Sequence, residues 1–125
     1  MVVFSNHRLG ASAEILVSRE VAVCMLRETA DAARPVAEDR WERELVAWLE
    51  DRARRPDGID ANDLAWTPEH FESQRRFVVE AIQRAIEVGS PHETALRRWA
   101  HLIESHPRDS VRFGRRWSWL GSATA

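Results

Sequence analysis

The sequence predicts a mainly α-helical fold, built as a single-domain bundle of about four helices over residues 1–125. A length of 125 residues suits one ordinary domain, and 44% of the residues are hydrophobic, close to the usual value for globular proteins. Apolar residues recur at spacings of three and four along much of the chain, which is the period of an amphipathic helix. Proline and glycine lie between these stretches, at positions where helices end.

The charge composition is nearly balanced, and it bears on the class of partner. The chain has 18 basic residues, all of them arginine, against 20 acidic residues, for a formal net charge of −2. Dedicated nucleic-acid binders usually have a clear basic excess, so this balance argues against that class. No apolar stretch approaches the roughly 20 residues that span a bilayer. The N-terminus also lacks the layout of a signal peptide, so we expect a cytoplasmic protein with no membrane partner.

Two arrangements fit the N-terminal part of the sequence. Residues 1–11 predict an irregular N-terminus, although their β-prone start allows a small β element at the termini. Residues 12–33 predict the first helix, with Ser12 as its N-cap. In the competing arrangement, Ser18 caps the helix and residues 15–17 form a short strand before it.

The first helix contains the only cysteine of the chain, Cys24, so no intrachain disulfide can form. Cys24 lies in the apolar run of residues 21–26, which predicts a central, buried stretch of helix. We expect Cys24 to be a buried and inert thiol there, not a nucleophile.

Residues 36–55 predict the second helix. Glu38 and Asp39 favour its N-terminus through the helix dipole, and arginines favour its C-terminal end. The Pro-Asp-Gly sequence of residues 56–58 stops the helix. One amphipathic stripe follows the helical period and consists of Ala37, Trp41, Leu45, Trp48, Leu49 and Arg52.

A loop over residues 56–67 leads to the third helix. Thr67 and Pro68 predict the start of this helix, as its N-cap and first helical residue. Gly89 stands where a C-terminal glycine is expected. We expect three loop residues to anchor on the core, namely Ile59, Leu64 and Trp66. The expected apolar face of the helix consists of Phe71, Val78, Ala81, Ile82, Ala85 and Ile86.

The fourth helix begins in residues 90–93, because Ser90 and Glu93 have the spacing of a capping box. It should end before Pro107. The link to the third helix is short, so we expect the two helices to form a C-terminal antiparallel αα-hairpin. The expected apolar face consists of Leu96, Trp99, Ala100 and Ile103.

Residues 107–125 form a C-terminal tail that is rich in arginine and tryptophan. We expect the tail to dock on the helices, with part of it binding a partner, because Trp and Arg are enriched at binding hot spots. Whether its aromatic residues complete the core or contact the partner stays open at this point. The expected partner-binding residues are Arg112, Phe113, Arg115, Arg116, Trp117 and Trp119.

Four residues at one end of the last two predicted helices are candidates for metal ligands. His101 and Glu104 are three apart and share a helix face, His106 follows, and His70 starts the neighbouring helix. Surface residues near helix ends explain the same pattern, and the Glu-x-x-His order of di-metal bundles is reversed here. The sequence therefore predicts no metal and no cofactor, with these four residues as weak candidates.

The function hypothesis follows mainly by elimination. The sequence shows no catalytic constellation and no phosphate-binding glycine loop, which argues against an enzyme. We expect a small protein–protein interaction module of the adaptor, inhibitor or immunity type, whose partner is another protein; a homo-oligomer is also compatible with the sequence. The first alternative is a nucleic-acid-associated accessory protein that uses the tail and the helix arginines Arg75, Arg76, Arg84, Arg97 and Arg98. The second alternative is a small metal-dependent enzyme centred on the four candidate ligands.

Overall fold

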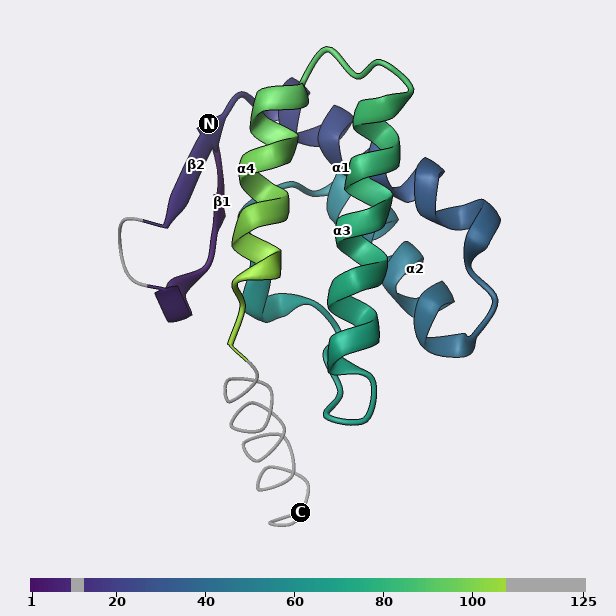
Figure 1. Ribbon diagram of the computed structural model, residues 1–125. Coiled ribbons are helices and arrows are strands. Elements are labelled where there is room, and N and C mark those ends of the chain that lie inside the picture. Colours follow the sequence, from purple (N-terminus) through teal and green to yellow (C-terminus); the bar gives the residue numbers. More distant parts are fainter. Residues whose placement is uncertain (10–12, 108–125) are drawn as a thin grey trace.

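The computed structural model describes residues 1–9 and 13–107, and shows a mainly helical fold with a small sheet beside the helices (Figure 1). The helices are α1 (Arg19–Ala33), α2 (Arg40–Arg54), α3 (Phe71–Glu87) and α4 (Glu93–Glu104). The strands are β1 (Val2–Ser5), β2 (Glu14–Val17) and β3 (Ile59–Asp60), and the 3-10 turns are η1 (His7–Leu9), η2 (Arg34–Val36) and η3 (Ala61–Asp63). Within these residues the prediction of a mainly helical fold with about four helices is confirmed.

The sheet has the strand order β2-β1-β3, so β1 is its central strand. β1 runs antiparallel to β2, with Phe4 opposite Ile15, and parallel to β3, with Phe4 opposite Ile59. These three side chains share one face of the sheet and are buried. Residues 2–5 therefore form a strand, which corresponds to the small β element that the sequence allowed at the termini. Residue 1 and residues 6–9 fit the predicted irregular N-terminus, and residues 10 and 11 lie outside the described residues.

The first helix is shorter than the predicted range of residues 12–33. It begins after a strand, and the Ser18 hydroxyl caps it by accepting a hydrogen bond from the Val21 N–H at 3.2 Å. The competing arrangement with Ser18 as N-cap is therefore the one observed. Pairing of β2 with β1 favours this arrangement over a helix that begins at Ser12. As a strand, β2 brings Ile15 into the core, and Ser18 then accepts a hydrogen bond at the N-terminus of α1.

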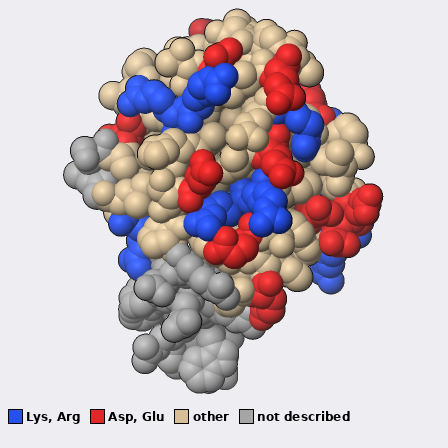
Figure 2. All heavy atoms as spheres, viewed as in Figure 1, with Lys and Arg blue, Asp and Glu red and all other residues tan. Residues whose placement is uncertain are grey.

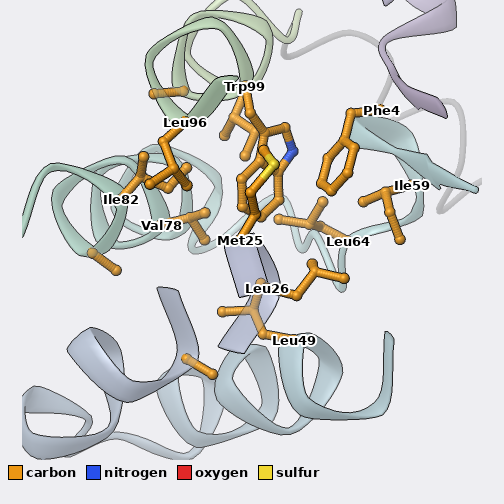
Figure 3. Packing of buried hydrophobic residues seen from close by; sticks show 14 of the residues in the cluster. Phe4, Met25, Leu26, Leu49, Ile59, Leu64, Val78, Ile82, Leu96 and Trp99 are labelled. Atoms are coloured by element: carbon orange, nitrogen blue, oxygen red, sulfur yellow. The ribbon is translucent and has the colours of Figure 1, made fainter. Parts of the chain in front are cut away.

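α1 is the central helix of the core and packs against both α2 and α3. Figure 3 shows Met25 next to Trp99 in the middle of the cluster, with Leu26 and Leu49 on the α2 side. Phe4 of β1 meets Trp99 of α4 edge to face, with ring centroids 5.1 Å apart. Each of these buried side chains contributes roughly 1.5–3 kcal/mol relative to an exposed one, so the sheet and α4 are held on the same core as α1.

Cys24 is exposed, so the expectation of a buried thiol is wrong. The buried face of α1 includes Ala22, Met25 and Leu26. At about 100° per residue, Cys24 is rotated about 200° from Ala22 and lies on the opposite side of the helix. An apolar run therefore does not ensure burial of every residue in it.

α2 begins at Arg40, later than the predicted start at residue 36, because residue 36 ends η2 and residues 37–39 are not helical. Asp39 and Glu42 then start the helix with a capping box. Leu45 and Leu49 of the predicted stripe are fully buried. The other members of that stripe are partly buried, namely Ala37, Trp41, Trp48 and Arg52.

Thr67 does not cap α3, contrary to the prediction. A turn closed by the His70 N–H and the Thr67 carbonyl, at 3.2 Å, precedes the helix. Gln74 holds this segment instead: its Oε1 accepts from the Thr67 N–H at 2.9 Å, and its Nε2 donates to the Ala65 carbonyl at 2.7 Å. The amide reaches backbone groups that a threonine hydroxyl at position 67 does not. The expected loop anchors do pack on the core, namely Ile59, Leu64 and Trp66.

Gly89 ends α3 as predicted. Its φ of +98° is in the left-handed region, and the Gly89 and Ser90 N–H groups donate to the Ile86 and Ala85 carbonyls in the pattern of a Schellman motif. α3 and α4 then lie side by side (Figure 1). Their predicted apolar faces are buried, apart from the partly buried Ile86, and comprise Phe71, Val78, Ala81, Ile82, Ala85, Leu96, Trp99, Ala100 and Ile103.

Ser90 does not form the predicted capping box with Glu93. Its hydroxyl donates to the Glu28 carboxylate of α1 at 2.5 Å and accepts from the His92 N–H at 3.0 Å. The bond to Glu28 uses the hydroxyl proton, and the hydroxyl oxygen accepts from the His92 N–H and not from the Glu93 N–H that a capping box requires.

We predict that Gly89→Ala destabilises the protein by about 1 kcal/mol, because alanine rarely adopts a left-handed backbone. Gly58→Ala is the matched control: neither added Cβ would meet another atom within 4 Å, and only Gly89 has a positive φ. Urea unfolding of both variants measures the two changes in free energy of unfolding. Equal changes at the two positions would contradict the assignment of strain to the backbone.

Candidate protein-interaction site

β2 is an edge strand with one open side (Figure 1). Its other side pairs with β1, and no element within the described residues pairs with the open side. The Asn6 N–H donates to the Ala13 carbonyl at 3.1 Å, and hydrogen-bonded pairs alternate along an antiparallel ladder. By this alternation Ile15 bonds to β1, whereas the backbone N–H and C=O groups of Glu14 and Leu16 point away from it.

A pocket of about 420 Å³ lies between β2 and α4, on the side where Ile15 faces the core. Leu16 is on the other face of the sheet and is 60% exposed. Strand, turn and helix each supply part of the pocket wall, so its shape depends on how the sheet is fixed to α4. The lining residues are Leu9, Ala13, Glu14, Ile15, Arg97, Arg98, His101 and Leu102.

The α4 side of the pocket carries basic residues. Arg97 forms an ion pair with Glu93 one turn earlier, at 3.0 Å. Arg98 donates from Nη2 to the backbone carbonyl of Glu14 at 3.5 Å, and within the described ranges it makes no ion pair. His101, one turn after Arg97, is exposed on the same rim. The rim therefore presents Arg98 as a cation next to an open backbone edge.

A buried asparagine fixes the two walls of the pocket to each other. Asn6 directly follows β1, and its Nδ2 donates to the Leu102 carbonyl of α4 at 2.8 Å. Its Oδ1 accepts from the Arg8 N–H at 3.2 Å and lies 3.3 Å from His106 Nδ1. These contacts hold η1, which carries Leu9, against the end of α4, so the pocket is formed before any partner binds.

His106 is fully buried and stacks on Trp66, with ring centroids 5.2 Å apart. Burial lowers the pKa of His106 from 6.5 to about 4; the Asp60 carboxylate opposes this shift, and the Arg8 and Arg75 guanidinium groups add to it. The imidazole is therefore neutral at pH 7. Because the amide oxygen of Asn6 can only accept, the neutral ring carries its proton on Nδ1.

The outer face of the sheet brings together three residues that sequence reasoning did not connect. Ser5 Oγ lies 3.5 Å from His7 Nε2, and His7 Nδ1 lies 3.4 Å from Asp60 Oδ2. The order of the groups is that of a Ser-His-Asp triad. They border a hollow of about 370 Å³ whose lining also includes Val3, Glu14, Gly58, Ile59 and Asp63.

The chemistry of these three groups is that of a structural tie. Ser5 is only 3% exposed, and its hydroxyl donates to Asp60 Oδ1 at 3.3 Å, so the oxygen is not presented as a nucleophile. The same Oδ1 accepts the His7 backbone N–H at 3.0 Å. Asp60 thus fastens β3 to the end of β1 and to η1, and the mostly exposed His7 side chain covers this junction.

The four weak metal-ligand candidates are not brought together. His70 stacks on Trp41 with ring centroids 5.4 Å apart, His106 is buried under Trp66, and His101 and Glu104 are exposed on α4. Within residues 1–9 and 13–107, no group of three or more His, Cys, Asp or Glu side chains is placed to hold a metal ion. Of the four, His101 alone lines the pocket beside β2.

The helix arginines lie among acidic side chains. Figure 2 shows positive and negative groups interleaved over the face of the molecule that carries α3 and α4. Arg75 pairs with Glu72 at 2.6 Å, and Arg97 pairs with Glu93. A duplex or single strand of nucleic acid binds best to a continuous basic surface, which this face does not provide.

The predicted partner-binding residues of the tail fall outside the described residues, so their role stays a prediction. They are Arg112, Phe113, Arg115, Arg116, Trp117 and Trp119.

The site at β2 was missed by sequence reasoning because its lining comes from three separate segments. The short apolar run of residues 15–17, which allowed a strand there, was the one signal that pointed to it.

Comparison with protein-family models, curated proteins and solved structures gave no significant match. None of the helices in the described ranges is both long and apolar enough to cross a membrane.

We predict that lowering the pH from 6.5 toward 4 destabilises the fold through His106. In this window the unfolded chain binds a proton on His106 that the folded chain excludes, so the free energy of unfolding falls as the pH falls. The loss reaches at most roughly 3 kcal/mol for a shift of this size. Urea unfolding at a series of pH values measures it.

His106→Gln should flatten this pH dependence, because the variant has no imidazole to protonate at that position. His101→Gln is the matched control, since its imidazole is exposed on α4. The same slope in His106→Gln as in the wild-type chain would show that other groups cause the acid sensitivity.

Proposed function

We propose that the chain is a small cytoplasmic protein-interaction module, of the adaptor, inhibitor or immunity type, which binds its partner by strand addition at β2. One observation carries this proposal: the open edge of β2, with outward backbone groups at Glu14 and Leu16, borders a preformed pocket. An open edge supplies main-chain hydrogen bonds to an incoming strand, and an adjacent pocket selects its side chains.

The edge is exposed in a way that supports binding. Native proteins commonly protect edge strands with prolines, charges or a covering segment. Here Leu16, in the middle of the open edge, leaves a large apolar side chain exposed on the outer face. A partner strand would pair with the backbone of Leu16 and Glu14, and its own outer-face side chains would cover Leu16.

The site is also built on rigid elements. Asn6 holds η1 to α4, and the Phe4 and Trp99 rings hold β1 to α4. A partner therefore meets walls that are already in place, and the main ordering cost falls on the partner segment. In the same proposal, the docked tail of residues 107–125 supplies further Arg and Trp contacts, as its composition predicts.

We predict that Leu16→Pro abolishes partner binding while Leu16→Thr retains most of it. The Leu16 N–H points away from β1, so proline removes a donor of the open edge without removing a β1–β2 hydrogen bond. Affinity purification from the native host, followed by mass spectrometry, compares the three proteins after nuclease treatment. Circular dichroism checks that each variant is folded.

Equal recovery of a stoichiometric partner by wild-type chain and Leu16→Pro would show that the β2 edge is not the binding site. Recovery of nucleic acid that is lost at high salt, with no protein partner, would favour the nucleic-acid alternative instead.

A further inference from the structure

We infer that the segment bound at β2 is an extended acidic one, with an apolar side chain that enters the pocket and a carboxylate that pairs with Arg98. This inference rests on the proposed strand addition and identifies the chemistry of the partner. It follows from the lining of the pocket, the position of Arg98, and the charges that a second copy of the chain would bring.

The pocket fits an apolar side chain from an added strand. Side chains of a strand alternate between the two faces of the sheet, so every second residue of an added strand would face α4. That face of the β2 edge opens on the pocket, whose apolar lining comes from Leu9, Ala13, Ile15 and Leu102. An inward Ile, Leu or Val would therefore be buried there.

Arg98 is placed to contact the next residue of the added strand that faces α4. Its Nη2 is 3.5 Å from the Glu14 carbonyl, which is one of the outward groups of the open edge. An added strand that takes over this carbonyl would release the guanidinium, and a carboxylate is a better partner for it than a neutral carbonyl. A carboxylate two residues from the apolar side chain would lie on the same face and within reach of Arg98.

The remaining charges of the rim favour the same partner. Arg97 lies on the α4 side of the pocket and pairs with Glu93, and Glu14 is the one acidic residue that lines the pocket. Glu14 stands opposite Ser5 in the sheet, on the face that points away from α4. An acidic side chain on the inner face thus meets Arg98 and is kept apart from Glu14.

A second copy of this chain fits the edge less well. A two-fold pairing of β2 with β2 would place both α4 helices on the same face of the joined sheet. The Arg98 guanidinium groups of the two copies would then lie on the same face of the joined sheet, where Glu93 of each α4 already pairs with Arg97. Like charges brought together in this way oppose association, so the charges select a different chain.

The test uses three blocked, fluorescein-labelled nonapeptides. Each has Ile at its fifth position, Glu, Gln or Lys at the third and seventh positions, and Thr elsewhere, so the Ile and the variable residues share one face of an extended strand. Fluorescence anisotropy measures their binding to the full chain. We expect the Glu peptide to bind about tenfold tighter than the Gln peptide at low salt, and the Lys peptide to bind more weakly than both.

Variants assign the preference to its residue. Arg98→Ala should bring the affinities for the Glu and Gln peptides close together, and Arg98→Glu should make the Lys peptide the best ligand. Arg76→Ala is the matched control, because Arg76 is an exposed arginine on α3 outside the pocket. Leu16→Pro should weaken the binding of all three peptides, since it acts on the backbone.

Each other outcome overturns the inference. Equal affinities for the Glu and Gln peptides, with binding lost in Leu16→Pro, would refute an acidic partner while leaving strand addition in place. No binding of any peptide at millimolar concentration would refute both. A dimer of the free chain in analytical ultracentrifugation that Leu16→Pro dissociates would make a second copy the occupant of the edge.

Discussion

The arrangement of the sheet against the helices depends on one buried amide, the side chain of Asn6. A buried amide costs free energy unless its donors and acceptors are satisfied. Asn6 meets this need with the Leu102 carbonyl, the Arg8 N–H and the His106 ring, and two of these partners are 96 and 100 residues away. Its hydrogen bonds therefore join the two ends of the described chain. They hold η1, which lines the pocket beside β2, against α4, and burial keeps the His106 ring in this cluster neutral at pH 7.

The parts of the fold that could be predicted from the sequence are those decided by local chemistry. The apolar faces of α3 and α4 follow the helical period, and Gly89 ends α3 because only glycine readily takes a left-handed backbone there. The predictions that were wrong concern residues whose observed partners are distant in the sequence. Ser90 donates to Glu28, which is 62 residues away, and does not form the predicted capping box, and the choice of Ser18 over Ser12 as N-cap depends on pairing between β2 and β1.

The candidate site was harder to predict than the fold because none of its segments carries a recognisable pattern alone. Arg98 looks like an ordinary surface residue of an amphipathic helix, and Leu16 looks like part of an apolar run. Only the register of β2 on β1 makes one an edge cation and the other an exposed strand residue. A recognisable pattern can also mislead, as the group formed by Ser5, His7 and Asp60 shows. Their order suggests a catalytic triad, but Ser5 is buried, and the hydrogen bonds of Asp60 connect β1, η1 and β3.

Arg98 gives the open edge a selectivity that an apolar edge alone would lack. An unpaired strand with an exposed leucine invites pairing with any extended chain, including another copy of itself. A guanidinium beside the Glu14 carbonyl occupies part of the edge while no partner is present, and it repels a copy that brings the same cation. A segment that offers a carboxylate gains an ion pair in exchange for the carbonyl contact that it displaces. The same side chain can therefore protect the edge in the free protein and discriminate among strands that approach it.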